Sequence, residues 1–141
     1  GEQQCFLVLI NGVKMNNIFV SYNFKDRSIS HSIKGMSKDN YGPVNGRFVF
    51  VKNDVSSEGD SAIDSEIKNT MRYCDVALFL VGSESHNSPW IEREVELATS
   101  KNLPILVMQQ PNTSGGVPNS LKNRSYKECP WSAHALSQLL K

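Results

Sequence analysis

Short apolar runs and amphipathic segments alternate four times along the chain. The runs are rich in β-branched and aromatic residues, which is typical of buried strands, and they span residues 17–22, 48–51, 75–81 and 103–108. The segments between them repeat apolar residues at helical spacing. This alternation predicts an α/β fold, in which a doubly wound parallel sheet lies between two helix layers in a three-layer αβα arrangement.

The strand order follows from the size of the chain and from its most apolar run. Residues 75–81 are almost uniformly hydrophobic, which indicates a central strand covered on both faces. A chain of 141 residues suits a flavodoxin-like order of 2-1-3-4, with room for a fifth strand at the edge. Ligands of such sheets bind at the carboxyl ends of the strands. Residues 22–26, residues 82–88 and the helix that follows them are expected to meet there.

The helix that begins at Ser88 is the best marked in the sequence. Ser88 is a favourable N-cap, and Pro89 stands at the first helical position, where its missing N–H costs nothing. The core-facing stripe consists of Ile91, Val95 and Ala98. A last helix is predicted over residues 131–141, with Ala135 and Leu139 facing inward.

Glu94 lies at the border of that apolar stripe, one turn after Trp90, if each residue turns the helix by about 100°. Geometry leaves two interpretations open: an ordinary boundary residue of a surface helix, or an acid placed for chemistry. The expected position of the helix, beside the ligand crevice, strengthens the second. Glu92, Arg93 and Glu96 are expected to point away from the core.

Composition excludes several classes of protein. The hydrophobic content of 39% and charged content of 21% fit a globular domain, and a net charge of +1 without a basic stripe argues against nucleic-acid binding. The longest apolar runs are far too short to span a membrane. Three widely spaced cysteines suggest neither a disulfide framework nor a zinc site, so the cytoplasm is the expected location. The three histidines have no ligand spacing, and no metal is expected.

Residues 1–14 precede the patterned sequence, which we assign to one domain over residues 15–141. The leading Gly1 and the later Met15 suggest that residues 1–14 are an extension or were added to the natural start. The apolar run at residues 5–10 leaves another interpretation open, in which it pairs as an added edge strand.

Two motifs then carry a resemblance. Residues 18–22 (Ile-Phe-Val-Ser-Tyr), with residues 24–27 after them, resemble the first-strand signature of Toll/interleukin receptor (TIR) domains. Residues 90–94 (Trp-Ile-Glu-Arg-Glu) resemble the W-x-x-x-E helix of that family, and residues 103–107 its fourth strand. The resemblance covers about residues 17–125 and is closest to the TIR-like branch of Thoeris anti-phage systems.

The resemblance implies an enzyme that cleaves NAD⁺ between nicotinamide and ribose, or that also cyclises the ADP-ribose product. NAD⁺ would be the substrate and no cofactor is expected. By position, Glu94 would be the catalytic glutamate and Trp90 would lie near the nicotinamide. The remaining expected substrate-binding residues are Ser21, Tyr22, Phe24, Lys25 and Ser83. Lys25 or Arg27 would meet the diphosphate.

The resemblance also implies partners and leaves alternatives. Residues 52–59 stand where TIR domains carry their loop after the second strand, but they lack its usual proline. Because that loop takes part in self-assembly in the family, a homo-oligomer is expected on activation, with a phage-derived trigger and a downstream effector. The alternatives are a TIR interaction module without catalysis and an N-glycosidase similar to nucleoside deoxyribosyltransferases, which also place a glutamate beside a sugar.

Overall fold

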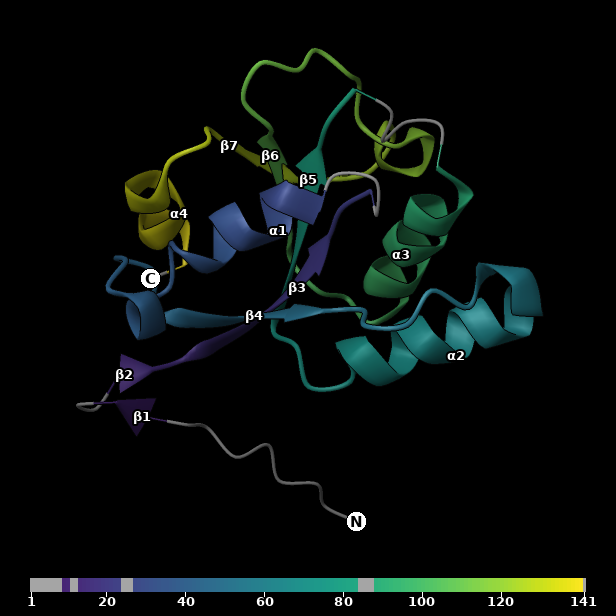
Figure 1. Ribbon diagram of the computed structural model, residues 1–141, viewed down its shortest axis with the longest axis horizontal. Helices are drawn as coiled ribbons and strands as arrows, with labels where there is room; N and C mark the ends of the chain where they lie inside the picture. The colour runs from purple at the N-terminus through teal and green to yellow at the C-terminus, as the bar shows by residue number, and fades with distance from the viewer. Residues whose placement is uncertain (1–8, 11–12, 24–26, 84–87, 141) are drawn as a thin grey trace.

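A parallel sheet of five strands forms the centre of the computed structural model, which describes residues 9–10, 13–23, 27–83 and 88–140 (Figure 1). The strands are β3 (Asn16–Ser21), β4 (Gly46–Phe50), β5 (Val76–Val81), β6 (Ile105–Gln109) and β7 (Lys127–Cys129). The α-helices are α1 (Arg27–Lys34), α2 (Asp60–Met71), α3 (Pro89–Ser100) and α4 (Ala133–Leu139). Single 3₁₀ turns are η2 (Lys38–Asn40), η3 (Ser56–Glu58) and η5 (Asn119–Leu121).

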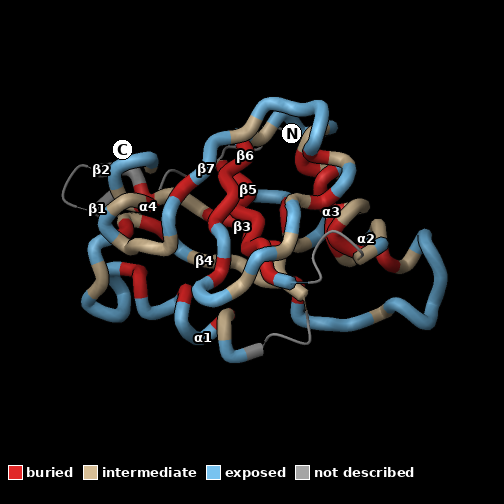
Figure 2. The backbone as a smooth tube through the Cα atoms, turned by 90° about the horizontal axis from the view of Figure 1, so that it is seen from above, coloured by how far each residue is buried: buried red, intermediate tan, exposed pale blue. Residues whose placement is uncertain are grey.

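The strand order is β4-β3-β5-β6-β7, and every neighbouring pair is parallel. This confirms the predicted flavodoxin-like order, and β7 is the fifth strand at the edge. All six residues of β5 are buried, as expected of a strand with helices on both sides. Figure 2 shows the same pattern, with buried backbone concentrated in β3, β5 and β6.

Helices cover the two faces of the sheet as an αβα sandwich (Figure 1). Helices α1 and α4 lie on one face, and α2 and α3 on the other. Each face has its own hydrophobic core, because alternate residues of a strand point to opposite sides. Ile67 and Val95 belong to the core under α2 and α3, whereas Ile33 and Leu136 belong to the core under α1 and α4.

Polar contacts fix α3 against α2. The Nε and a terminal nitrogen of the Arg93 guanidinium donate to the two carboxylate oxygens of Asp64 at 2.6 and 2.8 Å. At the far end of α3, the Lys101 ammonium donates to the carbonyl oxygens of Met71 and Arg72 and so satisfies the last turn of α2. The helix that carries Glu94 is therefore held at both ends.

Two local expectations need correction. Leu139 was expected inside, but it is 37% exposed, and Leu136 is fully buried instead. The Ser132 hydroxyl accepts from the Ala135 amide, so α4 begins later than predicted. Ala135 is half-buried against the core, as expected, and Leu136 and Leu140 take the inward place predicted for Leu139.

At the other end of the chain, β1 (Leu9–Ile10) pairs antiparallel with β2 (Val13–Lys14) in a small separate sheet. It does not add an edge strand to the main sheet, and residues 5–8 lie outside the described residues. The boundary between residues 14 and 15 stays a prediction.

None of the described helices is long and apolar enough to cross a lipid bilayer.

Candidate functional site

Helix α3 brings Trp90 and Glu94 to the carboxyl end of β3. The Ser88 hydroxyl accepts a hydrogen bond from the Ile91 amide at 3.3 Å, which caps the helix as the sequence predicts. With the start of the helix set in this way, Trp90 and Glu94 lie one turn apart on the side that faces the sheet, and both are buried. Glu94 is therefore not a boundary residue.

The Glu94 carboxyl group is enclosed, with only 2% of the residue exposed. Its Oε1 accepts a hydrogen bond of 2.6 Å from the hydroxyl of Ser21, the last residue of β3. The Trp90 side chain donates a second hydrogen bond to the same carboxyl group. Serine, tryptophan and glutamate thus form one buried polar cluster at the predicted end of the sheet.

Burial raises the pKa of Glu94 from 4.5 to about 8, although the hydrogen bonds from Ser21 and Trp90 oppose this rise. The charged form is penalised because it has lost its water. At neutral pH the acid is consequently mostly protonated in this enclosed state. A displaced pKa in a group at the ligand end of an α/β sheet is typical of a functional site.

The family model described as the Thoeris protein ThsB, TIR-like domain, matches residues 19–115, which is more than half of the chain. The chain belongs to the Thoeris ThsB TIR-like family. That membership associates this TIR-like domain with anti-phage defence. No curated protein matches the chain significantly.

The other expected site residues of the TIR-like domain lie in different surroundings. The Tyr22 ring packs on the α1 side of the sheet, edge-on to Phe50 with 5.9 Å between ring centres, because it follows Ser21 and so faces the other way. Ser83 is exposed just beyond β5. Phe24 and Lys25 lie outside the described residues. The roles of these four residues in substrate binding stay predictions.

Glu92 has a structural role that local patterning missed. It is half-buried, and its Oε1 accepts hydrogen bonds from the backbone amide, at 2.8 Å, and from the hydroxyl of Ser120 in η5. Its Oε2 is buried without a hydrogen-bond partner. Because Ser120 is far along the chain, no helical periodicity could have indicated this contact. Glu96 is exposed, as predicted.

The loop after β6 closes over the carboxyl end of β5. A Cβ atom added to Gly115 would lie 1.8 Å from the carbonyl oxygen of Gly82, so the two backbones pass each other where no side chain fits. Gln110 is buried beside Gly82, and its backbone amide donates to the Val81 carbonyl at 2.8 Å. This loop therefore shapes the same end of the TIR-like domain as Glu94.

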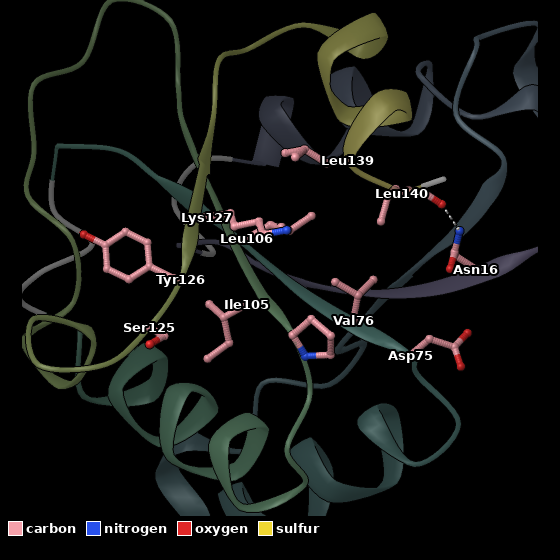
Figure 3. A pocket seen from close by; sticks show the side chains of 11 residues that line it. Asn16, Asp75, Val76, Ile105, Leu106, Ser125, Tyr126, Lys127, Leu139 and Leu140 are labelled. Carbon is pink, nitrogen blue, oxygen red and sulfur yellow. Dashed lines mark hydrogen bonds between the residues drawn. The ribbon is translucent and has the colours of Figure 1, made fainter.

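A pocket of about 590 Å³ lies at the opposite end of the sheet, where β5, β6 and β7 begin (Figure 3). Its wall is mostly apolar and includes Val76, Ile105, Leu106, Tyr126, Leu139 and Leu140. The Asn16 amide donates to the Leu140 carbonyl at its rim. Ligands of parallel α/β sheets bind at the carboxyl ends, so this pocket is separate from the candidate site.

No group of three or more metal-binding side chains gathers among the residues that the structure describes. Among the described residues, Glu94, Ser21 and Trp90 bring a carboxyl group, a hydroxyl and an indole to the candidate site.

Proposed function

We propose that this TIR-like domain cleaves the bond between nicotinamide and ribose in NAD⁺, as a glycohydrolase or as an ADP-ribosyl cyclase. The observation that carries the proposal is the buried Glu94, held by Ser21 and Trp90 at the carboxyl end of the sheet. Membership of the Thoeris family supports it. NAD⁺ is the substrate in this proposal, and no cofactor takes part.

The chemistry needs an anion and little else. When the C1′–N bond breaks, its electron pair leaves with the neutral nicotinamide, and positive charge develops on the ribose. A carboxylate beside the sugar stabilises that charge and accepts hydrogen bonds from ribose hydroxyls. Water then adds at C1′ and loses a proton, or a nucleophilic atom of the ADP-ribose itself adds there and closes a ring.

The positive charge of the substrate explains how Glu94, which is protonated in the enclosed state, can act as a carboxylate. The nicotinamide ring of NAD⁺ is cationic, and a cation near a carboxyl group lowers its pKa. Substrate binding would therefore convert Glu94 from the neutral acid of the enclosed state into the carboxylate that the reaction needs. Ser21, which already donates to the carboxyl group, favours the same form.

The biological setting forms part of the proposal. We propose that the domain acts in the cytoplasm, that it assembles with copies of itself in response to a phage-derived trigger, and that its ADP-ribose-derived product activates a separate effector. The Thoeris family match supports this setting.

The enclosure of Glu94 also favours a second candidate, a TIR interaction module in which Glu94 is only a structural acid. With 2% of the residue exposed, the carboxyl group reaches a sugar only after its surroundings rearrange. The two candidates differ in whether any condition produces turnover.

Release of free nicotinamide from NAD⁺, followed by chromatography, tests the proposal. The purified protein is assayed alone, with a crowding agent, and with lysate from phage-infected cells. We expect release in at least one condition, and its loss in Glu94→Gln but not in Glu96→Gln, which changes an exposed acid on the same helix. Equal release by all three proteins would refute the role of Glu94, and no release in any condition would favour the interaction module. Glu92→Gln is unsuitable as a control because Glu92 holds η5.

A further inference from the structure

Besides the pocket where β5, β6 and β7 begin, the structure has a hollow at the other end of the sheet, the end that holds Glu94. This hollow lies beside the carboxyl ends of β6 and β7. Its volume of about 440 Å³ is within the range of roughly 300–1,000 Å³ that is common for small-molecule sites. Its walls include Val107, Gln109, Gly115, Gly116, Val117 and Glu128. None of these residues contacts Glu94 in the cluster described above, and Gly115 belongs to the loop that closes over the carboxyl end of β5.

The pairing of the strands relates this hollow to Ser21 and Glu94. Ser21 of β3 is paired with Phe79 of β5, Phe79 with Val107 of β6, and Val107 with Glu128 of β7. Paired residues of neighbouring strands point to the same face, and Ser21 points toward α3. Ser21 and Glu128 therefore end one row of side chains, three strand spacings or roughly 14 Å apart.

The side chains of Gln109 and Glu128 offer hydrogen-bond acceptors to the hollow. Glu128 offers a carboxylate. Gln109 uses both hydrogens of its amide nitrogen within the protein, on the Val81 carbonyl at 3.2 Å and the Thr113 hydroxyl at 2.6 Å, so its carbonyl oxygen is the group that remains for a ligand. Val107 and Val117 add apolar surface. Such a hollow suits a flat ligand rich in N–H and O–H donors, and the carboxylate repels phosphate.

We propose that this hollow is the subsite for the adenosine half of the dinucleotide, an inference that rests on the proposed function. Adenine supplies a flat ring and an amino group with two donors, and its ribose supplies two hydroxyls. The nicotinamide riboside half then lies at Glu94, at the other end of the row.

Gly116 gives the sharpest test. Gly116 lines the hollow, and a Cβ atom added there meets no atom within 4 Å, so a valine adds bulk at this wall without a clash with the protein. Glu128→Gln removes the charge and is the second variant. The matched control is Lys127→Gln, the next residue on β7, which lines the pocket at the opposite end of the sheet. Thermal unfolding confirms that each variant is folded.

Two substrates separate the subsite from the catalytic centre. NAD⁺ and nicotinamide mononucleotide share the bond that breaks, but only NAD⁺ carries adenosine. We expect Gly116→Val and Glu128→Gln to raise KM for NAD⁺ roughly tenfold, while turnover of the mononucleotide changes less than about twofold. Lys127→Gln should change neither. Equal losses with both substrates, or no change in KM for NAD⁺, would overturn the proposal.

Binding gives a readout that does not need catalysis. Titration of adenosine, followed by ligand-observed NMR, should show binding to the wild-type protein and to Lys127→Gln, and weaker binding to Gly116→Val and Glu128→Gln. Absence of binding to wild type, or equal binding to Gly116→Val, would overturn the subsite. If the wild-type protein releases no nicotinamide, the proposed activity fails, and this titration still decides whether the hollow takes adenosine.

Discussion

Replacing Glu94 by Gln should remove a large part of the pH dependence of this protein's stability. The folded protein holds Glu94 with a pKa of about 8, whereas the ordinary value is 4.5. A raised folded-state pKa means that the protonated form stabilises the fold. The contribution is complete below about 4.5, and it is lost as the pH rises through about 8. Gln is neutral throughout, and its amide oxygen can still accept from Ser21.

The size of the effect follows from the two pKa values. Their difference, between about 8 and 4.5, at about 1.4 kcal/mol per pH unit, corresponds to a loss on the order of 5 kcal/mol in the free energy of unfolding. This would be a substantial part of the stability of a domain of this size. No discount for solvent exposure applies, since only 2% of Glu94 is exposed.

Urea unfolding at a series of pH values between 5 and 9, followed by tryptophan fluorescence, measures this effect. The stability of wild type relative to Glu94→Gln should fall as the pH rises, at nearly the limiting slope of about 1.4 kcal/mol per pH unit below pH 8. For Glu96→Gln, which changes an exposed acid, the free energy of unfolding should vary with pH in the same way as in wild type. If the free energies of unfolding of wild type and Glu94→Gln also vary with pH in the same way, Glu94 does not titrate as an enclosed acid, and the reasoning is refuted.

Three further substitutions test other contacts. Ser21→Ala removes a hydrogen bond that lowers the pKa of Glu94, so the pH profile of nicotinamide release should move to higher pH. An unmoved profile would show that Ser21 does not influence the ionisation of Glu94. Arg93→Lys loses the two-point contact with Asp64, which is about one-third exposed, and should lower the urea concentration at the midpoint of unfolding. An unchanged midpoint would show that the pair does not stabilise the fold. Ile67→Ala empties a fully buried position and should cost about 2–5 kcal/mol in the same measurement, and a smaller loss would mean that the core closes around the gap.

Local signals in the sequence were sufficient for the four predicted strands and for the phase of α3, but not for the start of α4 or the exposure of Leu139. The cap at Ser88 and the stripe of Ile91, Val95 and Ala98 placed Trp90 and Glu94 on one side of α3, and the structure has both side chains buried there. The alternation of strands and helices predicted a parallel sheet, because parallel strands need crossover connections. The size of the chain and the apolar run at residues 75–81 predicted the strand order. The end of the sheet that holds Ser21 and Glu94 followed from that order.

Contacts between distant segments were beyond those signals. Helical periodicity placed Glu92 on the solvent side, and only the course of the chain around Ser120 gave its carboxylate a partner. The register that puts Ser21 and Glu128 at the two ends of one row depends on the pairing of four strands.

The burial of Glu94 most clearly separates what the sequence determined from what the tertiary structure decided. The sequence by itself determined that this residue sits at the edge of an apolar stripe near the ligand end of the sheet, because helix geometry depends on neighbouring residues alone. Only the tertiary structure decided that the carboxyl group is enclosed, bonded to Ser21, and raised in pKa to about 8. Burial and its electrostatic cost depend on what packs against a side chain, and those atoms come from segments far away in the chain.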